Sequence, residues 1–357
     1  MNWQDRRLLD LFGIEHPILQ APMAGVTSPQ LAIATSEAGA LGSIAGAMLS
    51  LDGLRQEFQV VKQGTSRSFN VNFFVHKPPA VDAARDARWR QRLAPYYQEL
   101  GVPADAKGPS RAAFDGAACD LVLEFKPKVA SFHFGLPDRT LMQRLKGAKI
   151  LVIGSATTAE EARWLEGEGV DAVIAQGAEA GGHRGMFLTD DIARQAGTMA
   201  LVPQVVDAVK VPVIAAGGIG DGRGIAAALA LGAAGVQIGT AFMLTPEAKT
   251  APMHRAALKK ANDNSTTLTN VFTGRPARGI VNRVVSEVGP MSPDAPAFPL
   301  AAEAMQPLRG PAEAKGSTDF TALWSGQAPT LAREMPAGEL VAAMVRETGA
   351  AFSRARG

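Results

Sequence analysis

Two glycine-rich segments in the second half of the chain have the composition of an anion-binding site. The first reads Ile214-Ala-Ala-Gly217-Gly218-Ile219-Gly220 and the second Gly235-Val-Gln237-Ile238-Gly239-Thr240. Glycines that follow a strand let backbone N–H groups approach an anion, and the dipole of a following helix adds to the attraction. These glycines could instead only form tight turns, but two such turns in succession favour a phosphate site. Their spacing matches neither a P-loop nor the dinucleotide fingerprint, which favours a mononucleotide such as FMN.

A third glycine-rich segment carries the best candidate for acid–base chemistry. It reads Gln176-Gly-Ala-Glu-Ala-Gly181-Gly-His183-Arg-Gly185 and follows another apolar run. The Gln176 amide can donate and accept hydrogen bonds at the edge of a flavin ring, and the glycines let the loop lie against a planar ligand. His183 would extend from this flexible loop over the pocket, where an imidazole can act near neutral pH. A solvated histidine without a function is the alternative.

Three further segments place polar or backbone groups at the ends of apolar runs. Asn72 interrupts Phe69-Asn-Val-Asn-Phe73, where a buried amide needs a partner. His133 ends a similar run, and it points into the mouth of the fold if the flanking phenylalanines face outward. A buried histidine with a structural hydrogen bond is the alternative. Pro22 and Met23 follow a first apolar run, and their backbone could contact a flavin edge or simply form a turn.

Eight short apolar runs predict the strands that would position these residues. Most are apolar at every position, which is typical of strands buried on both faces of a parallel sheet. The predicted strands are residues 17–22, 41–45, 69–74, 129–134, 150–154, 172–175, 213–216 and 235–238. The predicted helices are residues 29–38, 51–62, 138–146, 158–168, 200–209 and 223–231. Eight alternating units favour an α/β fold of the (β/α)8 TIM-barrel type over an open doubly wound sheet, with the candidate site at its C-terminal face.

Two segments depart from the alternating pattern. Residues 76–128 are too long for a simple connection, and residues 245–317 are rich in proline, alanine and glycine with irregular spacing. A regular amphipathic pattern returns at residues 338–350 and could be a late eighth barrel helix. We therefore predict a barrel formed by residues 1–245 and 318–357. Residues 246–317, with the insertion 76–128, are predicted to form a smaller lid subdomain over the C-terminal face.

Composition excludes several classes of protein. The 357 residues include 36 basic and 34 acidic ones, and this near balance gives no electrostatic signature for nucleic acid or acidic membranes. The single cysteine, Cys119, excludes an intrachain disulfide framework, and no cluster has the spacing of metal ligands. The charged start and the absence of a long apolar stretch predict a soluble, cytoplasmic protein, monomeric or homodimeric. We assign no function to His16, His76, His254 or residues 274–279.

In their order and combination these segments resemble the nitronate monooxygenase family, formerly called 2-nitropropane dioxygenases, in its bacterial class I branch. The similarity runs from about residue 16 to residue 282 and returns at residues 320–327. It is carried by Gln20-Ala-Pro-Met23, Asn70-Val-Asn72-Phe73, Ser131-Phe-His133-Phe-Gly135, the segment from Gln176 to His183, Ala216-Gly-Gly-Ile219 and Gln237-Ile-Gly-Thr240. The resemblance implies that Asn72, Gln176, Gly181, Gly218 and residues 237–240 bind FMN, that His183 is the active-site histidine, and that His133 lies beside the substrate.

The resemblance also implies a reaction. An alkyl nitronate, such as propionate 3-nitronate, would be oxidised by O2 to a carbonyl compound and nitrite by way of a flavin semiquinone. Two alternatives remain: an NAD(P)H-dependent flavin reductase of quinones or enoyl thioesters on the same barrel, and a flavin- or phosphate-binding protein without catalysis. One departure concerns the substrate pocket, because class I relatives tend to place tyrosines there from the C-terminal segment. This chain has only Tyr96 and Tyr97, both in the insertion, and carries Phe298 where a tyrosine is expected.

Overall fold

Eight parallel strands form a closed barrel. The computed structural model describes residues 3–109 and 112–356, so residues 110–111 of the predicted insertion, the first two residues and the last one lie outside the description. The strand order is β1-β9-β8-β6-β5-β4-β3-β2. A parallel bridge between Leu19 and Leu41, with Gln20 N donating to Leu41 O at 2.9 Å, joins β1 to β2 and closes the sheet. The predicted (β/α)8 barrel is confirmed.

All the predicted strands and helices overlap elements of the structure. The barrel strands are β1 (Ile18–Gln20), β2 (Gly42–Ala45), β3 (Phe69–Phe74), β4 (Val129–His133), β5 (Leu151–Ala156), β6 (Ala172–Gln176), β8 (Val213–Ala216) and β9 (Gly235–Ile238). The helices that follow them in turn are α2 (Pro29–Glu37), α3 (Leu51–Gly64), α5 (Gly116–Phe125), α6 (Arg139–Gly147), α7 (Ala159–Gly167), α8 (Thr198–Ala208), α9 (Gly222–Ala230) and α13 (Ala337–Arg356). Short 3-10 turns lie at Gly46–Met48, Ile192–Arg194, Thr240–Phe242 and Pro329–Leu331.

The strands are apolar at successive positions because both of their faces are buried. One set of side chains, including Val71, Val173 and Val236, packs under the surrounding helices. The alternate set, including Leu19 and Ile174, packs inside the barrel with residues of α1 (Arg7–Phe12), a short helix that the sequence did not predict. These inner residues and α1 fill the N-terminal end, and polar side chains remain at the C-terminal end.

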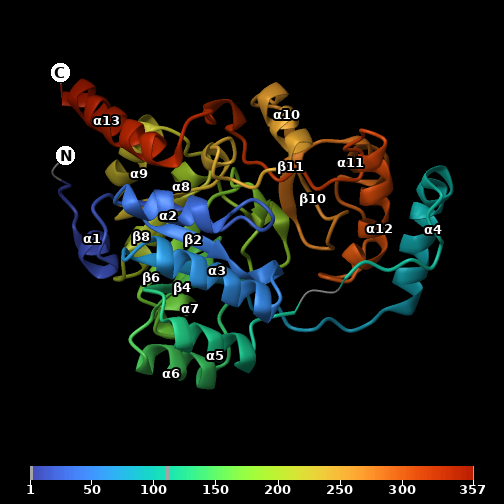
Figure 1. Cartoon of the computed structure of the whole chain (residues 1–357), viewed down its shortest axis with the longest axis horizontal. Coiled ribbons are helices and arrows are strands. Elements are labelled where there is room, and N and C mark those ends of the chain that lie inside the picture. The colour runs from blue at the N-terminus through green and yellow to red at the C-terminus, as the bar shows by residue number, and fades with distance from the viewer. Residues whose placement is uncertain (1–2, 110–111, 357) are drawn as a thin grey trace.

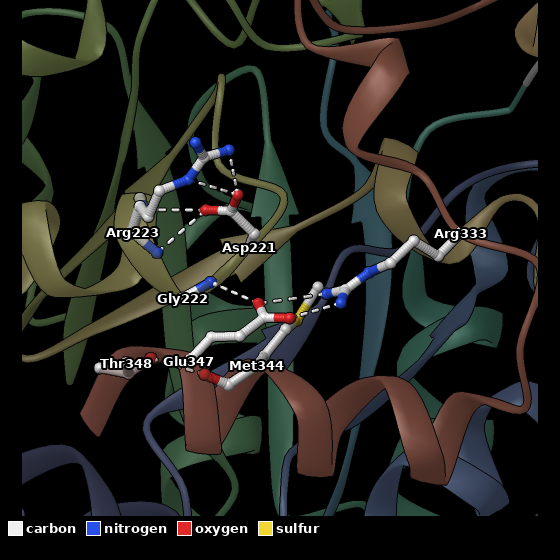
Figure 2. A network of polar contacts seen from close by, with 8 residues as sticks. Asp221, Gly222, Arg223, Arg333, Met344, Glu347 and Thr348 are labelled. Carbon is white, nitrogen blue, oxygen red and sulfur yellow. Dashed lines mark hydrogen bonds and ion pairs between the residues drawn. The ribbon is translucent and has the colours of Figure 1, made fainter. Parts of the chain in front are cut away.

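Helix α13 closes the helical ring between α9 and α2, and it is the late eighth helix that the sequence predicted (Figure 1). The two helices approach closely at Gly222, where a Cβ would meet the backbone of α13. Figure 2 shows the polar contacts between α13 and α9: Glu347 accepts a hydrogen bond from Gly222 N at 3.1 Å and forms an ion pair with Arg333 at 2.5 Å. The barrel is therefore complete only when the end of the chain has folded back onto it.

A second group of elements lies beside the barrel, on the right in Figure 1. It contains α4 (Ala83–Leu100), α11 (Arg283–Val288), α12 (Ala301–Ala314) and the strands β10 (Thr266–Thr269) and β11 (Ala277–Ile280). Strand β7 (Gly182–His183) of the barrel pairs with β11, and α10 (Pro252–Lys260) buries Leu258 in the barrel core. Trp89 of α4 is buried with Val285 and Leu308 in a hydrophobic cluster separate from the barrel core. The two irregular segments of the sequence thus share one core. Helix α5, although within the predicted insertion 76–128, packs on α3 and α6 of the barrel.

The described residues contain neither a membrane-spanning helix nor a metal-binding cluster. No helix there is both long enough and apolar enough to span a membrane. No group of three or more histidine, cysteine, aspartate or glutamate residues within the same ranges is arranged to hold a metal ion.

Candidate active site

His183 lies in a strand. It forms β7 with Gly182, and β7 pairs antiparallel with β11 so that His183 faces Ala277. The neighbouring Arg184 N donates to Pro276 O at 2.8 Å, and only 8% of His183 is exposed. The predicted flexible loop is therefore wrong at this residue, because β11, which is far away in the sequence, provides a partner for its backbone. His183 has a fixed main chain.

Two side chains of the barrel also hold the carbonyl oxygen of His183. Gln176 Nε2 donates to it at 2.9 Å from the end of β6, and His133 Nε2 lies 3.0 Å from it at the end of β4. Gln176 Oε1 in addition accepts from Gly185 N at 2.7 Å. Since a carbonyl oxygen only accepts, His133 must carry its proton on Nε2. These residues position the segment that carries His183.

His133 is predominantly neutral at physiological pH. Burial lowers its pKa to about 4, and the charges of Arg275 and Arg184 act in the same direction against the hydrogen bond to His183. Phe132 packs outward among Phe73 and Phe114, as expected, and His133 turns toward the barrel mouth. The ring of His133 therefore contacts the main chain of His183 and supports it by a hydrogen bond. The expectation that Phe134 also faces outward is wrong, because its ring packs against His183 and Phe298.

Aromatic rings surround the imidazole of His183. The ring centroids of Phe298 and Trp324 each lie 5.4 Å from it, and those of Phe74 and Phe134 lie 5.8 and 5.9 Å away. Phe134 has a φ of 75°, a left-handed backbone that is rare for a bulky side chain and indicates local strain. The strained residue therefore belongs to the wall around His183.

Neither tyrosine reaches this wall. The hydroxyl of Tyr96 donates to Glu287 at 2.7 Å, and that of Tyr97 donates to the carbonyl oxygen of Ala304, both within the second hydrophobic cluster. Phe298 instead occupies the position against His183. The wall of the site, as far as the structure describes it, contains no phenolic hydroxyl.

The surroundings of His183 carry positive charge without carboxylate partners. Arg184 is fully buried and bonds the carbonyl oxygens of Gln176 and Gly177, at 2.7 and 2.5 Å. The guanidinium of Arg275 lies 4.1 Å from the centre of the Phe134 ring and bonds Met186 O. No acidic side chain of the described residues lies within 4.0 Å of Arg184 or Arg275. Burial lowers the pKa of each guanidinium to about 10, so both stay charged and favour an anion nearby.

A buried chain of hydrogen bonds links Arg184 to Glu161. Glu161 is fully buried and accepts from Thr157 N and Oγ1, both at 2.7 Å, and from Leu188 N at 3.1 Å. Thr157 is joined through Gln195 to Arg184, over 3.0 and 2.9 Å. This network fixes the whole segment between β6 and α8, including His183.

The glycine turn after β8 has the backbone that an anion-binding turn requires. Gly217 and Gly218 have φ values of 117° and 71°. A Cβ on Gly217 would lie 2.9 Å from Thr198 Oγ1 and 3.0 Å from Ala180 N, so only glycine fits there. A Cβ on Gly218 would meet Glu179 Cβ at 3.3 Å. The turn is thus packed against the segment that leads to His183.

The other predicted phosphate residues converge on the same place. A Cβ on Gly239 would touch the sulfur of Met23 at 3.6 Å, which brings the turns after β1 and β9 together. Thr240 Oγ1 accepts from Gly326 N at 2.9 Å, and a Cβ on Gly181 would lie 2.5 Å from that nitrogen. Four backbone segments therefore meet in one glycine cradle, made of Gly181, Gly217, Gly218, Gly239, Thr240 and Gly326, with Met23 after β1 in contact with it.

Carboxylates cap the helices α8 and α9 beside these turns. Helix α9 begins after Asp221, whose carboxylate accepts from Arg223 N at 2.9 Å and Gly224 N at 3.3 Å. Glu179 does the same for α8 by accepting from Thr198 N at 2.8 Å. Burial raises the pKa of Asp221, but hydrogen bonds from Arg223 and the backbone outweigh this and lower it. The N-termini of α8 and α9 therefore already hold carboxylates, whereas the helical turn Thr240–Phe242 after Gly239 has no side-chain cap.

The remaining cofactor candidates follow or end barrel strands and differ in how far their side chains are exposed. Asn72 Nδ2 donates to the hydroxyl and carbonyl oxygens of Ser131, at 3.0 and 3.1 Å. Pro22 and Gln237 are partly exposed. The Ile238 side chain is fully buried in the outer hydrophobic cluster, so only its backbone can contribute to a ligand site.

The structure adds three residues that sequence reasoning missed. Thr273 Oγ1 lies 2.9 Å from His183 Nε2, Trp324 packs on the same ring, and Gly326 joins the glycine cradle. No local pattern marks Thr273, because its partner lies 90 residues earlier. Trp324 and Gly326 lie within the segment 320–327 that resembles the family. His254, which we left without a role, donates from Nε2 to Trp324 O at 3.1 Å.

Comparison with known proteins shows which family the chain belongs to. Residues 5–347 match the family model described as nitronate monooxygenase. Nitronate monooxygenases from Paraburkholderia phytofirmans and Pseudomonas aeruginosa are each 44% identical to this chain, over 96% of it and over 94% and 98% of their own lengths. The structure of nitroalkane oxidase from Streptomyces ansochromogenes is 42% identical with a TM-score of 0.89, covering 98% of this chain and 99% of that one. FabK from Thermotoga maritima is 28% identical, with a TM-score of 0.74 over 100% of this chain and 99% of its own. The chain belongs to the nitronate monooxygenase family and is an oxidoreductase.

Proposed function

We propose that this enzyme binds FMN and oxidises alkyl nitronates with O2 to a carbonyl compound and nitrite. One observation carries the proposal: the segment from Gln176 to Gly185 contributes Gly181 to the glycine cradle and His183 to the aromatic wall. A phosphate held by the cradle would place the remainder of a mononucleotide within reach of His183. The positive charge of Arg184 and Arg275 suits an anionic substrate.

The residues of the barrel mouth fit the cofactor. Gly217 and Gly218 have a backbone that a Cβ would disturb, and backbone N–H groups of such turns are the common ligands of phosphate. Asn72, Gln176 and Gln237, with the backbone of Pro22, Met23 and residues 238–240, would contact the remainder of the cofactor. Bound FMN would supply the electron acceptor for the nitronate. The second group of elements, α4, α11 and α12 with β10 and β11, would act as the lid that keeps the pocket dry.

The protein side chains would orient the substrate and handle its proton. His183 would bind the nitronate anion, or remove the α-proton when the substrate is a neutral nitroalkane. Its position is fixed by β11, Gln176 and His133, which limits the loss of entropy on reaching the reactive arrangement. The aromatic wall would exclude water from the reacting carbon.

Two measurements on the purified protein test this proposal. Flavin released by heat should be FMN, and incubation with propionate 3-nitronate should consume O2 and release nitrite. FAD, or a protein that takes up no flavin on reconstitution, would rule out the mononucleotide site. A flavoprotein that releases no nitrite from any nitronate would rule out the reaction.

A further inference from the structure

Thr273 brings a hydroxyl group to the ring of His183. Its Oγ1 lies 2.9 Å from Nε2, and both residues are buried, Thr273 with 2% of its surface exposed. Thr273 belongs to the turn between β10 and β11, outside the barrel. The ring of the proposed active-site histidine is therefore in contact with the second group of elements as well as with the barrel.

The turn that carries Thr273 is held in place by its own contacts. Asn270 exchanges two hydrogen bonds with the backbone of Ser292, both at 2.8 Å, and Asn270 O accepts from Gly274 N at 2.7 Å. Gly274 has a φ of 88°, and a Cβ there would collide with Pro296 O and the backbone of Phe298. The turn thus places Thr273 beside the imidazole of His183. It also contacts the segment 296–298, whose Phe298 ring packs against the same imidazole.

The hydroxyl has an acceptor within reach other than the imidazole. Thr273 Oγ1 lies 3.4 Å from Arg275 O and 3.5 Å from Arg275 N. The Arg275 carbonyl oxygen can only accept a hydrogen bond. If the Thr273 hydroxyl donates to it, the lone pairs of Thr273 Oγ1 remain available to accept from a donor such as a ring N–H. Nε2–H of His183 is the nearest such donor. A hydroxyl oriented in this way holds the tautomer with the proton on Nε2.

We propose that Thr273 is a positioning residue for His183, whose hydroxyl accepts a hydrogen bond from Nε2–H and so fixes the ring and its tautomer. The inference rests on the proposed function of His183. When His183 takes the α-proton of a neutral nitroalkane, the C–H electron pair stays on the substrate as the nitronate and the ring becomes an imidazolium. The hydrogen bond to Thr273 then becomes charge-assisted and stronger, which stabilises the protonated ring.

Nuclear magnetic resonance of the histidine side chains tests the contact directly. In the ¹⁵N-labelled flavoprotein, with the His183 signals assigned by the His183→Asn variant, His183 should carry its proton on Nε2. Thr273→Val keeps the shape but removes the hydroxyl, and it should lower the pKa of His183 by about one pH unit, the equivalent of one hydrogen bond. Thr273→Ser should restore the wild-type titration. A proton on Nδ1 in the wild type, or an unchanged titration in Thr273→Val, overturns the proposal.

Kinetics provide a second readout with a matched control. Thr273→Val should reduce kcat/KM for nitroethane by on the order of tenfold and move the acidic limb of its pH profile to lower pH. Thr269→Val removes a buried hydroxyl from the same segment, where Oγ1 bonds Pro290 O at 2.7 Å, and should leave the profile in place. Equal profiles for the two valine variants contradict the proposal. Full activity of His183→Asn would instead refute the proposed function, while the resonance experiment would still report on the contact.

Discussion

His133 Nε2 donates a hydrogen bond to the main-chain oxygen of His183, across 3.0 Å. The two histidines are 50 residues apart in the chain and lie at the ends of different strands, β4 and β7. The contact is between a ring and a backbone, so it does not form a relay of protons between the two rings. It makes His133 part of the support of His183.

Removing this donor should reduce activity without changing the pH dependence at neutral pH. His133→Phe keeps a planar ring but leaves the His183 carbonyl with one donor fewer, and we expect kcat/KM to fall about tenfold. His133→Gln can still donate and should recover most of the loss. Because burial lowers the pKa of His133 to about 4, its charge does not change between pH 6 and 8. A pH–rate profile of His133→Gln that lost its acidic limb would show that His133 is itself the titrating group.

Replacing His183 separates proton removal from anion binding. His183→Asn keeps a polar side chain but has no base, so turnover of neutral nitroalkanes should fall by about 10²–10⁴-fold. Activity with a preformed nitronate should fall far less, because that substrate has already lost its proton. Nitrite release from both forms, corrected for flavin content, gives the comparison. Equal losses would indicate anion binding alone, and no loss with either form would remove His183 from the mechanism.

Replacing a glycine of the cradle should cause a loss of FMN that backbone strain at another positive-φ glycine does not cause. Gly218→Val would place its side chain against Glu179 and distort the turn, and the purified protein should retain less than about a tenth of the wild-type flavin. Gly101→Val is the matched control, since Gly101 has a similar φ of 66° with no atom within 4 Å of its Cβ position. Both variants should lose some thermal stability. Full flavin content in Gly218→Val would place the phosphate elsewhere.

The free energy of unfolding should fall at acidic pH because buried His254 is harder to protonate in the folded protein than in the unfolded chain. Burial lowers the pKa of His254 to about 4, whereas in the unfolded chain it is near 6.5. Between these pH values the unfolded chain binds more protons, so the free energy of unfolding falls as the pH drops from about 6.5 to 4 and gains nothing above that window. His254→Gln can keep the donor to Trp324 O but does not titrate, and its thermal midpoint should fall less between pH 7 and pH 5. Parallel declines in both proteins would show that His254 is not involved.

The barrel was predictable because its signals are local. Apolar runs such as residues 172–175 and 213–216 identify strands with both faces buried, and the glycine-rich segments that follow them are visible in the sequence. Helix α1 was missed because its six residues are too few to show a helical period, and so short a helix forms only by packing into the barrel end. The strand at His183 was missed because its partner, Ala277, comes much later in the chain. Asp221 did carry a local signal, since an aspartate directly before a helix is a common N-cap.

Anaerobic mixing of the purified, FMN-reconstituted protein with propionate 3-nitronate, and separately with NADH, tests the central claim most directly. The nitronate alone is expected to change the flavin spectrum rapidly, and admission of O2 should restore the oxidised spectrum with release of nitrite. NADH should leave the flavin oxidised over the same period. A flavin that NADH bleaches at once and that propionate 3-nitronate leaves unchanged would contradict the account and make the protein a nicotinamide-dependent reductase.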